Sequence, residues 1–194
     1  MKGTSTRRHA AAAAARRRVP RYAAVAATYA RVATGFDARR NRLLFERGWL
    51  ERFLAALPEE PRVLDLGCGA GEPIARYLIE RGCRLTGIEV ATAMIARCRR
   101  RFPDHAWRVA DMREFALPRR FDGLIAWDSV FHLDPRGQRR AVAAFARHAR
   151  PGAALLFTSG PAAGEAMGRA ADAPIYHASL DPPAYRALLA RHGF

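Results

Sequence analysis

A chain of 194 residues can build one sizeable core but is short for two, so the sequence predicts a single folded domain. Hydrophobic residues make up 50% of it and its mean hydropathy is -0.19, as in globular proteins, and no apolar run approaches the roughly 18 residues that span a membrane. The formal net charge of +15 raises the question of a polyanionic partner such as nucleic acid.

The basic residues are concentrated at the amino terminus. Residues 1–21 hold seven of the 33 basic residues and no acidic one, whereas the later arginines are mixed with Asp and Glu. This distribution argues against a nucleic-acid partner, because it leaves no basic stripe on the remainder of the chain. We expect residues 1–21 to be a disordered basic tail, with an organellar transit peptide or a secretory signal as alternatives.

The three cysteines form neither a CxxC pair nor a cluster with metal-ligand spacing. Their odd number, in a chain without a clear signal peptide, predicts reduced thiols in a cytoplasmic protein. We therefore expect no metal site from Cys68, Cys83 and Cys98.

Residues 22–58 have apolar residues at spacings of three and four, which predicts a helical lead-in that Pro58 ends. We expect two helices with a break near Gly35. The segment either packs on the core, as we expect for Trp49, or closes over a ligand as a lid that carries its tyrosines, Tyr22 and Tyr29.

Beyond the lead-in, apolar strands alternate with amphipathic helices. This order predicts an α/β fold: a Rossmann-like, doubly wound and mostly parallel sheet between two helical layers. After the fifth strand we expect a long polar loop of small residues over 159–174, and then a helix that Gly193 ends. The expected strands are 63–66, 84–90, 106–109, 121–127 and 153–158, and the expected helices are 74–81, 91–101, 135–149 and 182–192.

The stretch VLDLGCGAGEP, residues 63–73, joins a buried strand, a glycine turn and a helix start. Glycines in such a turn allow a ligand to approach the backbone closely. The spacing is GxGxG, and Glu72 stands where the pyrophosphate of a dinucleotide would rest on the helix start. An acid there disfavours NAD and favours S-adenosylmethionine, which carries a sulfonium and an ammonium group. Asp65 before the turn fits the same cationic ligand.

Two further acids follow the next strands. Glu89 lies 20 residues after Gly69, at a strand end, and predicts a carboxylate that accepts hydrogen bonds from a ribose diol. Asp111, in the segment VADM, is placed to accept from an adenine amino group, or to cap a helix. Ile88 or Val90 and Met112 are the apolar partners that we expect for the ring.

Taken together, these motifs resemble those of class I S-adenosylmethionine-dependent methyltransferases. The segments DLGCGAG, GIEV with Met94, ADM, FDGLIAWDSVFHL and RPGAALLFTSG are similar to the five family motifs in order, over roughly residues 22–194. The resemblance implies an enzyme that uses S-adenosylmethionine. The cofactor-binding residues that it implies are Asp65, Gly67, Cys68, Gly69, Glu89, Val90, Met94, Asp111, Met112, Trp127 and Asp128.

The chain departs from the family pattern at its carboxyl end. The family usually completes the sheet with two more strands, which are absent after Phe194. We therefore expect a truncated domain over 22–194 whose fifth strand forms an apolar edge, open to self-association. A milder departure is Glu89 in place of the more familiar Asp.

Methyl transfer is an in-line displacement, so positioning and exclusion of water supply much of the rate. A base is needed only for a protonated acceptor; Asp128 and His132 are the nearest candidates, and His177 and Glu165 come from segments that can reach the site. Residues 126–129, AWDS, lack the NPPY or DPPY sequence of enzymes that methylate nucleic acid or glutamine, which favours a small-molecule acceptor. The alternatives are a non-enzymatic S-adenosylmethionine-binding or regulatory protein and an NAD-dependent oxidoreductase.

Overall fold

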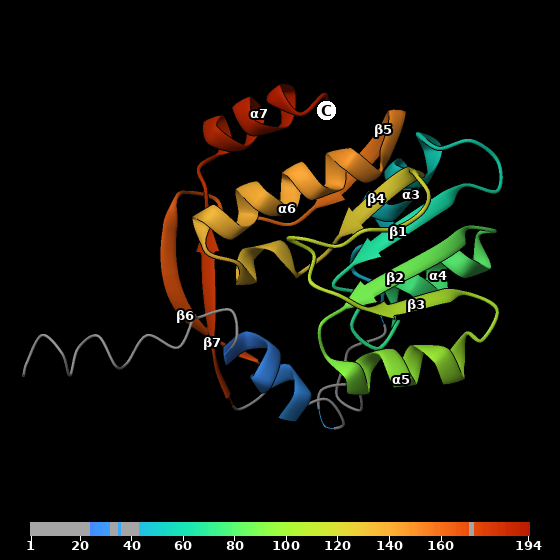
Figure 1. The fold of residues 1–194 in the computed structure, drawn as a ribbon, viewed down its shortest axis with the longest axis horizontal. Coiled ribbons are helices and arrows are strands. Elements are labelled where there is room, and N and C mark those ends of the chain that lie inside the picture. Colours follow the sequence, from blue (N-terminus) through green and yellow to red (C-terminus); the bar gives the residue numbers. More distant parts are fainter. Residues whose placement is uncertain (1–23, 32–34, 36–42, 171–172) are drawn as a thin grey trace, which may run out of the picture.

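A parallel sheet of five strands, in the order β3-β2-β1-β4-β5, forms the centre of the computed structural model, which describes residues 24–31, 35, 43–170 and 173–194 (Figure 1). The strand order reverses between β1 and β4, and ligands of doubly wound sheets bind at such switch points, beyond the carboxyl ends of the strands. The strands are β1 (Arg62–Leu66), β2 (Arg84–Glu89), β3 (Ala106–Val109), β4 (Phe121–Ala126) and β5 (Ala149–Phe157).

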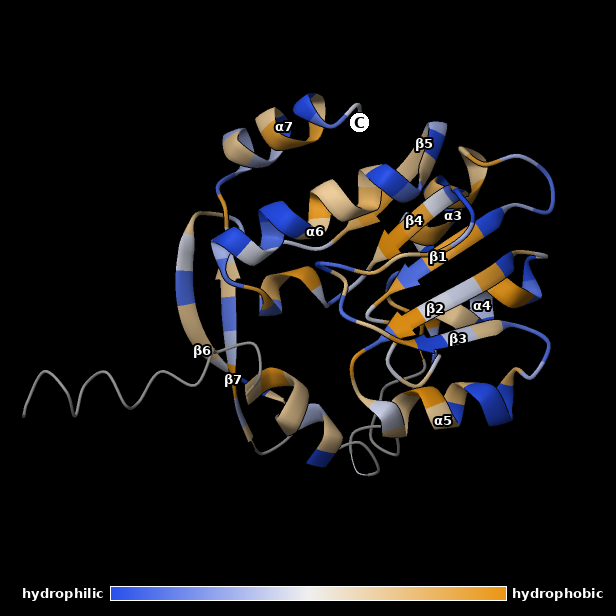
Figure 2. Cartoon of the chain, viewed as in Figure 1, coloured by the Kyte–Doolittle hydropathy of each residue, from blue (hydrophilic) through white to orange (hydrophobic). Residues whose placement is uncertain are grey.

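Helices cover both faces of the sheet, as the alternation of apolar residues predicts. Val63 of β1 packs with α3 (Arg47–Ala55), α4 (Ile74–Glu80) and α5 (Thr92–Arg101) on one face. Leu64 and Leu66 pack with α6 (Pro135–His148) on the other. Figure 2 shows that β4 is largely apolar, whereas α5 and α6 carry both apolar and polar residues. The expected three-layer α/β/α fold is confirmed.

Proline and aspartate define where α6 and the last helix, α7 (Pro182–Arg191), begin. Asp134 and Asp181 cap the two helices by accepting hydrogen bonds from the backbone N–H groups of Gly137 at 2.6 Å and Ala184 at 2.7 Å. Gly193 ends α7 with a φ of 83°, as expected for a glycine cap.

The expected loop over 159–174 is wrong for most of its length. Residues 164–170 and 173–174 belong to an antiparallel hairpin of β6 (Gly164–Ala170) and β7 (Ala173–Ser179), which forms a separate two-stranded sheet. Glycine and alanine in β6 resemble loop composition, but they alternate with Glu165, Met167 and Arg169 at the period of two that a strand requires. The hairpin stands beyond the arrowheads of the central strands (Figure 1).

The lead-in also differs from expectation. Trp49, expected in the core, is 55% exposed, with the Arg52 guanidinium 5.3 Å from its ring centroid. Helix α3 instead buries Leu50 and Phe53, because these residues lie on the face that meets the sheet. Residues 24–31 are helical, while Tyr22 and the break expected near Gly35 involve residues outside the described ranges.

Strand β5 is one edge of the five-stranded sheet in the described part of the chain, as the sequence predicts. The expected basic tail, residues 1–21, lies outside the described ranges. Among the helices that the structure describes, none combines the length and apolar composition needed to cross a membrane.

Candidate functional site

A glycine turn at the end of β1 forms the base of the site. Gly67 has a φ of 80°, and a Cβ atom on it would lie 2.5 Å from the Ser129 Cβ atom. The backbone N–H groups of Gly67 and Cys68 both donate to the Ile88 carbonyl, at 2.8 and 3.1 Å. Only glycine fits such a position without strain, so the turn stays open toward the strand ends.

Two carboxylates flank this turn, on neighbouring strands. Asp65 is 4% exposed, and burial, together with the charge of Glu89, raises its pKa to about 7. Glu89 accepts hydrogen bonds from the backbone N–H groups of Ala91 at 3.0 Å and Gly69 at 3.4 Å. Burial raises the pKa of Glu89 too, against the opposing effect of these hydrogen bonds. Such a pair favours a cationic ligand, because a nearby positive charge stabilises both ionised forms.

Glu72, the acid expected to repel a pyrophosphate, lines the site with a side chain that is only 5% exposed. Arg76 forms an ion pair with it, with nitrogen-to-oxygen distances of 2.6 to 3.0 Å. This pairing neutralises much of its charge. The preference for a cation therefore depends on Asp65 and Glu89 rather than on Glu72.

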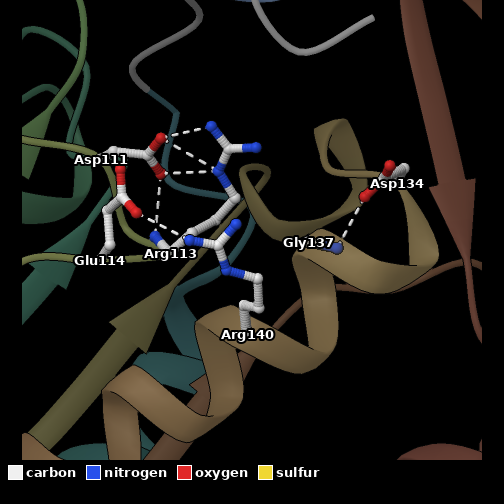
Figure 3. Close-up of polar contacts among 6 residues, drawn as sticks. All are labelled: Asp111, Arg113, Glu114, Asp134, Gly137 and Arg140. Atoms are coloured by element: carbon white, nitrogen blue, oxygen red, sulfur yellow. Dashed lines mark hydrogen bonds and ion pairs between the residues drawn. The ribbon is translucent and has the colours of Figure 1, made fainter. Parts of the chain in front are cut away.

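Asp111 forms an ion pair with an arginine two residues further along the chain. Its carboxylate accepts three hydrogen bonds from the Arg113 side chain, at 2.5 to 3.0 Å, and one from the Arg113 backbone N–H (Figure 3). Burial alone would raise the pKa of Asp111, but the bonds and charge of Arg113 lower it. Figure 3 also shows Glu114 paired with Arg140 and the Asp134 cap of α6 nearby.

A cavity of about 330 Å³ opens over the turn and the strand ends. Asp65 and Asp111 do not line it, whereas Ala110 and Met112, on either side of Asp111, do. The structure thus brings most of the expected residues together. The expected residues that line the cavity are Tyr29, Gly67, Cys68, Gly69, Ile88, Glu89, Val90, Met94, Met112, Trp127, Asp128, His132 and His177.

The far wall of the cavity is aromatic. His132, in the 3₁₀ turn Val130–His132, is buried between Tyr29 of the helix 24–31 and Tyr176 of β7. Its Nδ1 atom lies 3.1 Å from the Tyr176 carbonyl oxygen, which can only accept, so Nδ1 carries the proton. Nε2 then accepts from the Tyr29 hydroxyl at 3.0 Å. Burial, with a contribution from His177, lowers the pKa of His132 to about 4, so the ring is neutral at neutral pH.

Asp128 lies at the mouth of the cavity in a left-handed conformation, with a φ of 49°. Its backbone N–H donates to the Thr158 Oγ1 atom at 2.7 Å, which ties the end of β4 to the end of β5. The next residue, Ser129, donates from its hydroxyl to the Leu66 carbonyl oxygen at 2.7 Å. These two bonds fix residues 128–129, which separate the glycine turn from the aromatic wall.

Sequence reasoning missed the residues that the hairpin and its neighbours contribute. The expected loop over 159–174 pointed to Glu165 alone among the residues of β6, and Glu165 does not line this cavity. The alternation in GEAMGRA and APIYHAS is the signal that could have identified the strands. The cavity residues missed in this way are Val25, Ser129, Phe131, Arg169, Ala170 and Ile175.

Within the described ranges, no group of three or more His, Cys, Asp or Glu residues could hold a metal ion. All three cysteines are free thiols. Cys68 and Cys98 both donate to the Gly69 carbonyl oxygen, at 3.7 and 3.2 Å, so they contribute to the packing of the turn.

Comparison with known proteins identifies the central part of the chain. Residues 63–152 match the family model described as a methyltransferase domain. The chain is 34% identical over 101 residues to a dTDP-3-amino-3,4,6-trideoxy-alpha-D-glucopyranose N,N-dimethyltransferase from Streptomyces venezuelae, an alignment that covers 51% of this chain and 42% of the relative. It is 32% identical over 139 residues to a malonyl-[acyl-carrier protein] O-methyltransferase from Enterobacter lignolyticus, covering 70% and 53%. The chain therefore spans about half the length of these curated relatives.

Solved structures share the fold. An amino pentose methyltransferase from Micromonospora echinaspora, solved with S-adenosylmethionine bound, superposes with a TM-score of 0.65 and 22% identity, covering 80% of this chain and 84% of that one. A sugar N-methyltransferase from a Streptoalloteichus species superposes with a TM-score of 0.62 and 23% identity, covering 82% and 83%.

Proposed function

The chain belongs to the class I S-adenosylmethionine-dependent methyltransferases, and we propose that it transfers a methyl group from that cofactor to a small-molecule amine. The observation that carries the proposal is the glycine turn beside the Asp65–Glu89 pair, whose raised pKa values call for a positively charged ligand. The dinucleotide alternative requires a pyrophosphate next to these two acids and is disfavoured.

The residues around the turn fit the groups of the cofactor. S-adenosylmethionine supplies an activated methyl group on a positively charged sulfur, and its nucleoside offers a ribose diol and an adenine ring. Glu89 would accept from the ribose hydroxyls, and Asp65 would stabilise the cationic amino-acid part through its charge. Ile88 and Met112, which line the same cavity, would pack on the adenine ring. Asp111 would serve mainly to hold this segment in place through Arg113.

Tyr29 and His132 support binding of the acceptor on the opposite wall. A histidine with a pKa of about 4 is a poor proton acceptor at neutral pH, so we assign His132 an orienting role rather than that of a base. Its Nε2 atom accepts a hydrogen bond from the Tyr29 hydroxyl. The lone pairs of the phenol oxygen therefore point away from that bond. This oxygen would accept a hydrogen bond from the N–H of the acceptor amine and hold the nitrogen lone pair for in-line attack.

An amine on a sugar ring is the acceptor that the relatives support. Three of the curated relatives are N,N-dimethyltransferases of dTDP-linked amino sugars, and the similar structures include sugar and glycopeptide N-methyltransferases. A relative that methylates a malonyl carrier protein on oxygen makes an ester-forming reaction the second candidate. The orientation of the Tyr29 hydroxyl favours the amine: it donates to His132 Nε2, so its oxygen can accept from an N–H group but has no proton left to donate to a carboxylate.

Calorimetric titration of the full chain with S-adenosylhomocysteine and, separately, with NAD tests the proposal. We expect saturable one-site binding of S-adenosylhomocysteine and none of NAD; the reverse pattern would identify an oxidoreductase. Methyl transfer to free amino sugars, measured as release of S-adenosylhomocysteine, tests the reaction. Cofactor binding without turnover on amines or carboxylates would instead indicate a non-enzymatic binding protein.

A further inference from the structure

A second cavity, of about 410 Å³, adjoins the first. It lies between the segment that follows β5 and the end of the hairpin where β6 begins and β7 ends, and it shares two residues, Phe131 and His177, with the cofactor cavity. Their rings meet edge to face with centroids 4.9 Å apart. A molecule that passes this ring pair would occupy both cavities at once.

Small residues of β6 form part of the floor of the second cavity. Gly164 and Ala166 line it, and Ala166 is the cross-strand neighbour of His177. Gly168 continues the same face, but the His177 ring covers it, because a Cβ atom there would lie 2.5 Å from the His177 Cε1 atom. A Cβ atom on Gly164 would meet no heavy atom within 4 Å, so a planar or ring-shaped group has room close to the backbone at that end.

The volumes of the two cavities indicate which part of the bound molecules each cavity can hold. Cavities that bury drug-sized molecules occupy about 300–1,000 Å³, so one of about 330 Å³ is largely filled by a nucleoside cofactor and the reacting amine. The remainder of an acceptor must therefore extend beyond it. The second cavity is large enough to receive a further ring.

The charges around the second cavity define the chemical class of that ring. Among the described residues, its lining contains one carboxylate, Glu165, and neither arginine nor lysine. A diphosphate would therefore find no permanent cation among those lining residues. Phe131 and the Gly and Ala floor offer apolar contact, while Ser159 and Ser179 add hydroxyl groups.

From these observations, and resting on the proposed methyl transfer, we propose that the second cavity binds the part of the acceptor that lies beyond the methylated amine. This part is an uncharged, flat ring. The acceptor is then an amino sugar joined to a second ring, such as an aromatic aglycone, with the amine in the first cavity and the second ring on the hairpin floor.

Two commercial probes test the proposal: 4-nitrophenyl glucosaminide, which carries the second ring, and glucosamine, which lacks it. Their affinities for the full chain are measured by ligand-observed NMR in the presence of S-adenosylhomocysteine. We expect the aryl glycoside to bind at least about tenfold more tightly. Ala166→Trp fills the second cavity and should reduce this preference to about one. Met167→Trp makes the same substitution one residue along β6, at a side chain that is 66% exposed and lines neither cavity, and should leave it unchanged.

Equal affinity of the two probes for the wild-type chain would overturn the proposal, as would failure of the aryl glycoside to bind. The second cavity would not be the binding site of the ring if the preference for the aryl glycoside persisted in Ala166→Trp. The same conclusion would follow if Met167→Trp abolished the preference to the same extent. The affinity for S-adenosylhomocysteine is measured alongside in each protein. If it is retained while the probe preference is absent, only the second-ring assignment fails; if it is absent from the wild-type chain, the proposed function itself fails.

Discussion

The two sides of the cavity are assembled in different ways. The cofactor side comes mostly from one stretch, residues 65–112, in which Asp65 and Glu89 lie at the carboxyl ends of β1 and β2 and Met112 follows β3. The acceptor side combines the helix 24–31, the 3₁₀ turn after β4 and the hairpin, which are distant in the sequence. The cofactor side is thus fixed by local geometry, whereas the acceptor side exists only once tertiary contacts such as the Tyr29–His132 bond have formed.

The largest effect is expected when a carboxylate is removed from the cofactor side. Glu89→Ala should weaken binding of S-adenosylhomocysteine about 100-fold, because two charge-assisted hydrogen bonds to the ribose are lost. Glu114→Ala removes a carboxylate from an exposed ion pair with Arg140 and should leave the affinity unchanged. Calorimetry on both variants measures the difference, and equal affinities would place the ribose elsewhere.

On the acceptor side, Tyr29→Phe should lower kcat for methyl transfer about 10- to 100-fold, because it removes the oxygen that would orient the amine. The affinity for S-adenosylhomocysteine should stay within about twofold of the wild-type value. Tyr77→Phe is the control: Tyr77 is buried, whereas Tyr29 is half-buried, and Tyr77 lies on α4 outside the cavity lining. Steady-state kinetics that show equal losses in the two variants would refute the separation of the two sides.

The cofactor side could largely be predicted from the sequence, whereas the acceptor side could not. The strand ends, the turn at Gly67 and the position of Glu89 were predictable, because glycine positions and strand-end acids are local signals. The ion pair between Asp111 and Arg113 was not predictable, since it depends on the rotamer of Arg113. The hairpin was missed because β6 is built from glycine and alanine on one face, and Trp49 was misassigned because spacing alone does not fix which helix face meets the sheet.

The raised pKa of Asp65 predicts a pH dependence confined to the cofactor side. Its ionised fraction rises about tenfold between pH 6 and pH 8 for a pKa of about 7, so affinity for the cationic cofactor should rise by up to that factor. The ligand-free chain should behave in the opposite sense. A raised folded pKa stabilises the fold fully below the unfolded value near 3.8, and this stabilisation is lost as the pH rises through about 7.

Asp65→Asn is the variant that tests this linkage. It should flatten the pH dependence of binding relative to the wild-type chain and raise the free energy of unfolding of the ligand-free protein by about 1–3 kcal/mol at pH 8. Titrations in buffers of different ionisation enthalpy measure the proton released on binding. Identical pH profiles for the two proteins would show that Asp65 does not titrate in this range.

The smallest expected effect concerns the junction between the two sides. Thr158→Val removes the acceptor for the Asp128 backbone N–H and should lower kcat/KM about fivefold, whereas Thr158→Ser should restore it. Asp128→Gly adopts the left-handed conformation without strain but lacks the carboxylate. If Thr158 acts by positioning Asp128, the double variant should be no worse than Asp128→Gly alone, and additive losses in kcat/KM would argue against that role.

A crystal structure of the full chain with S-adenosylhomocysteine tests the central claim most directly. We expect the nucleoside over the glycine turn, the ribose hydroxyls within hydrogen-bonding distance of the Glu89 carboxylate, and the second cavity free of the cofactor. Binding in the hairpin cavity, or a ribose that makes no contact with Glu89, would contradict it.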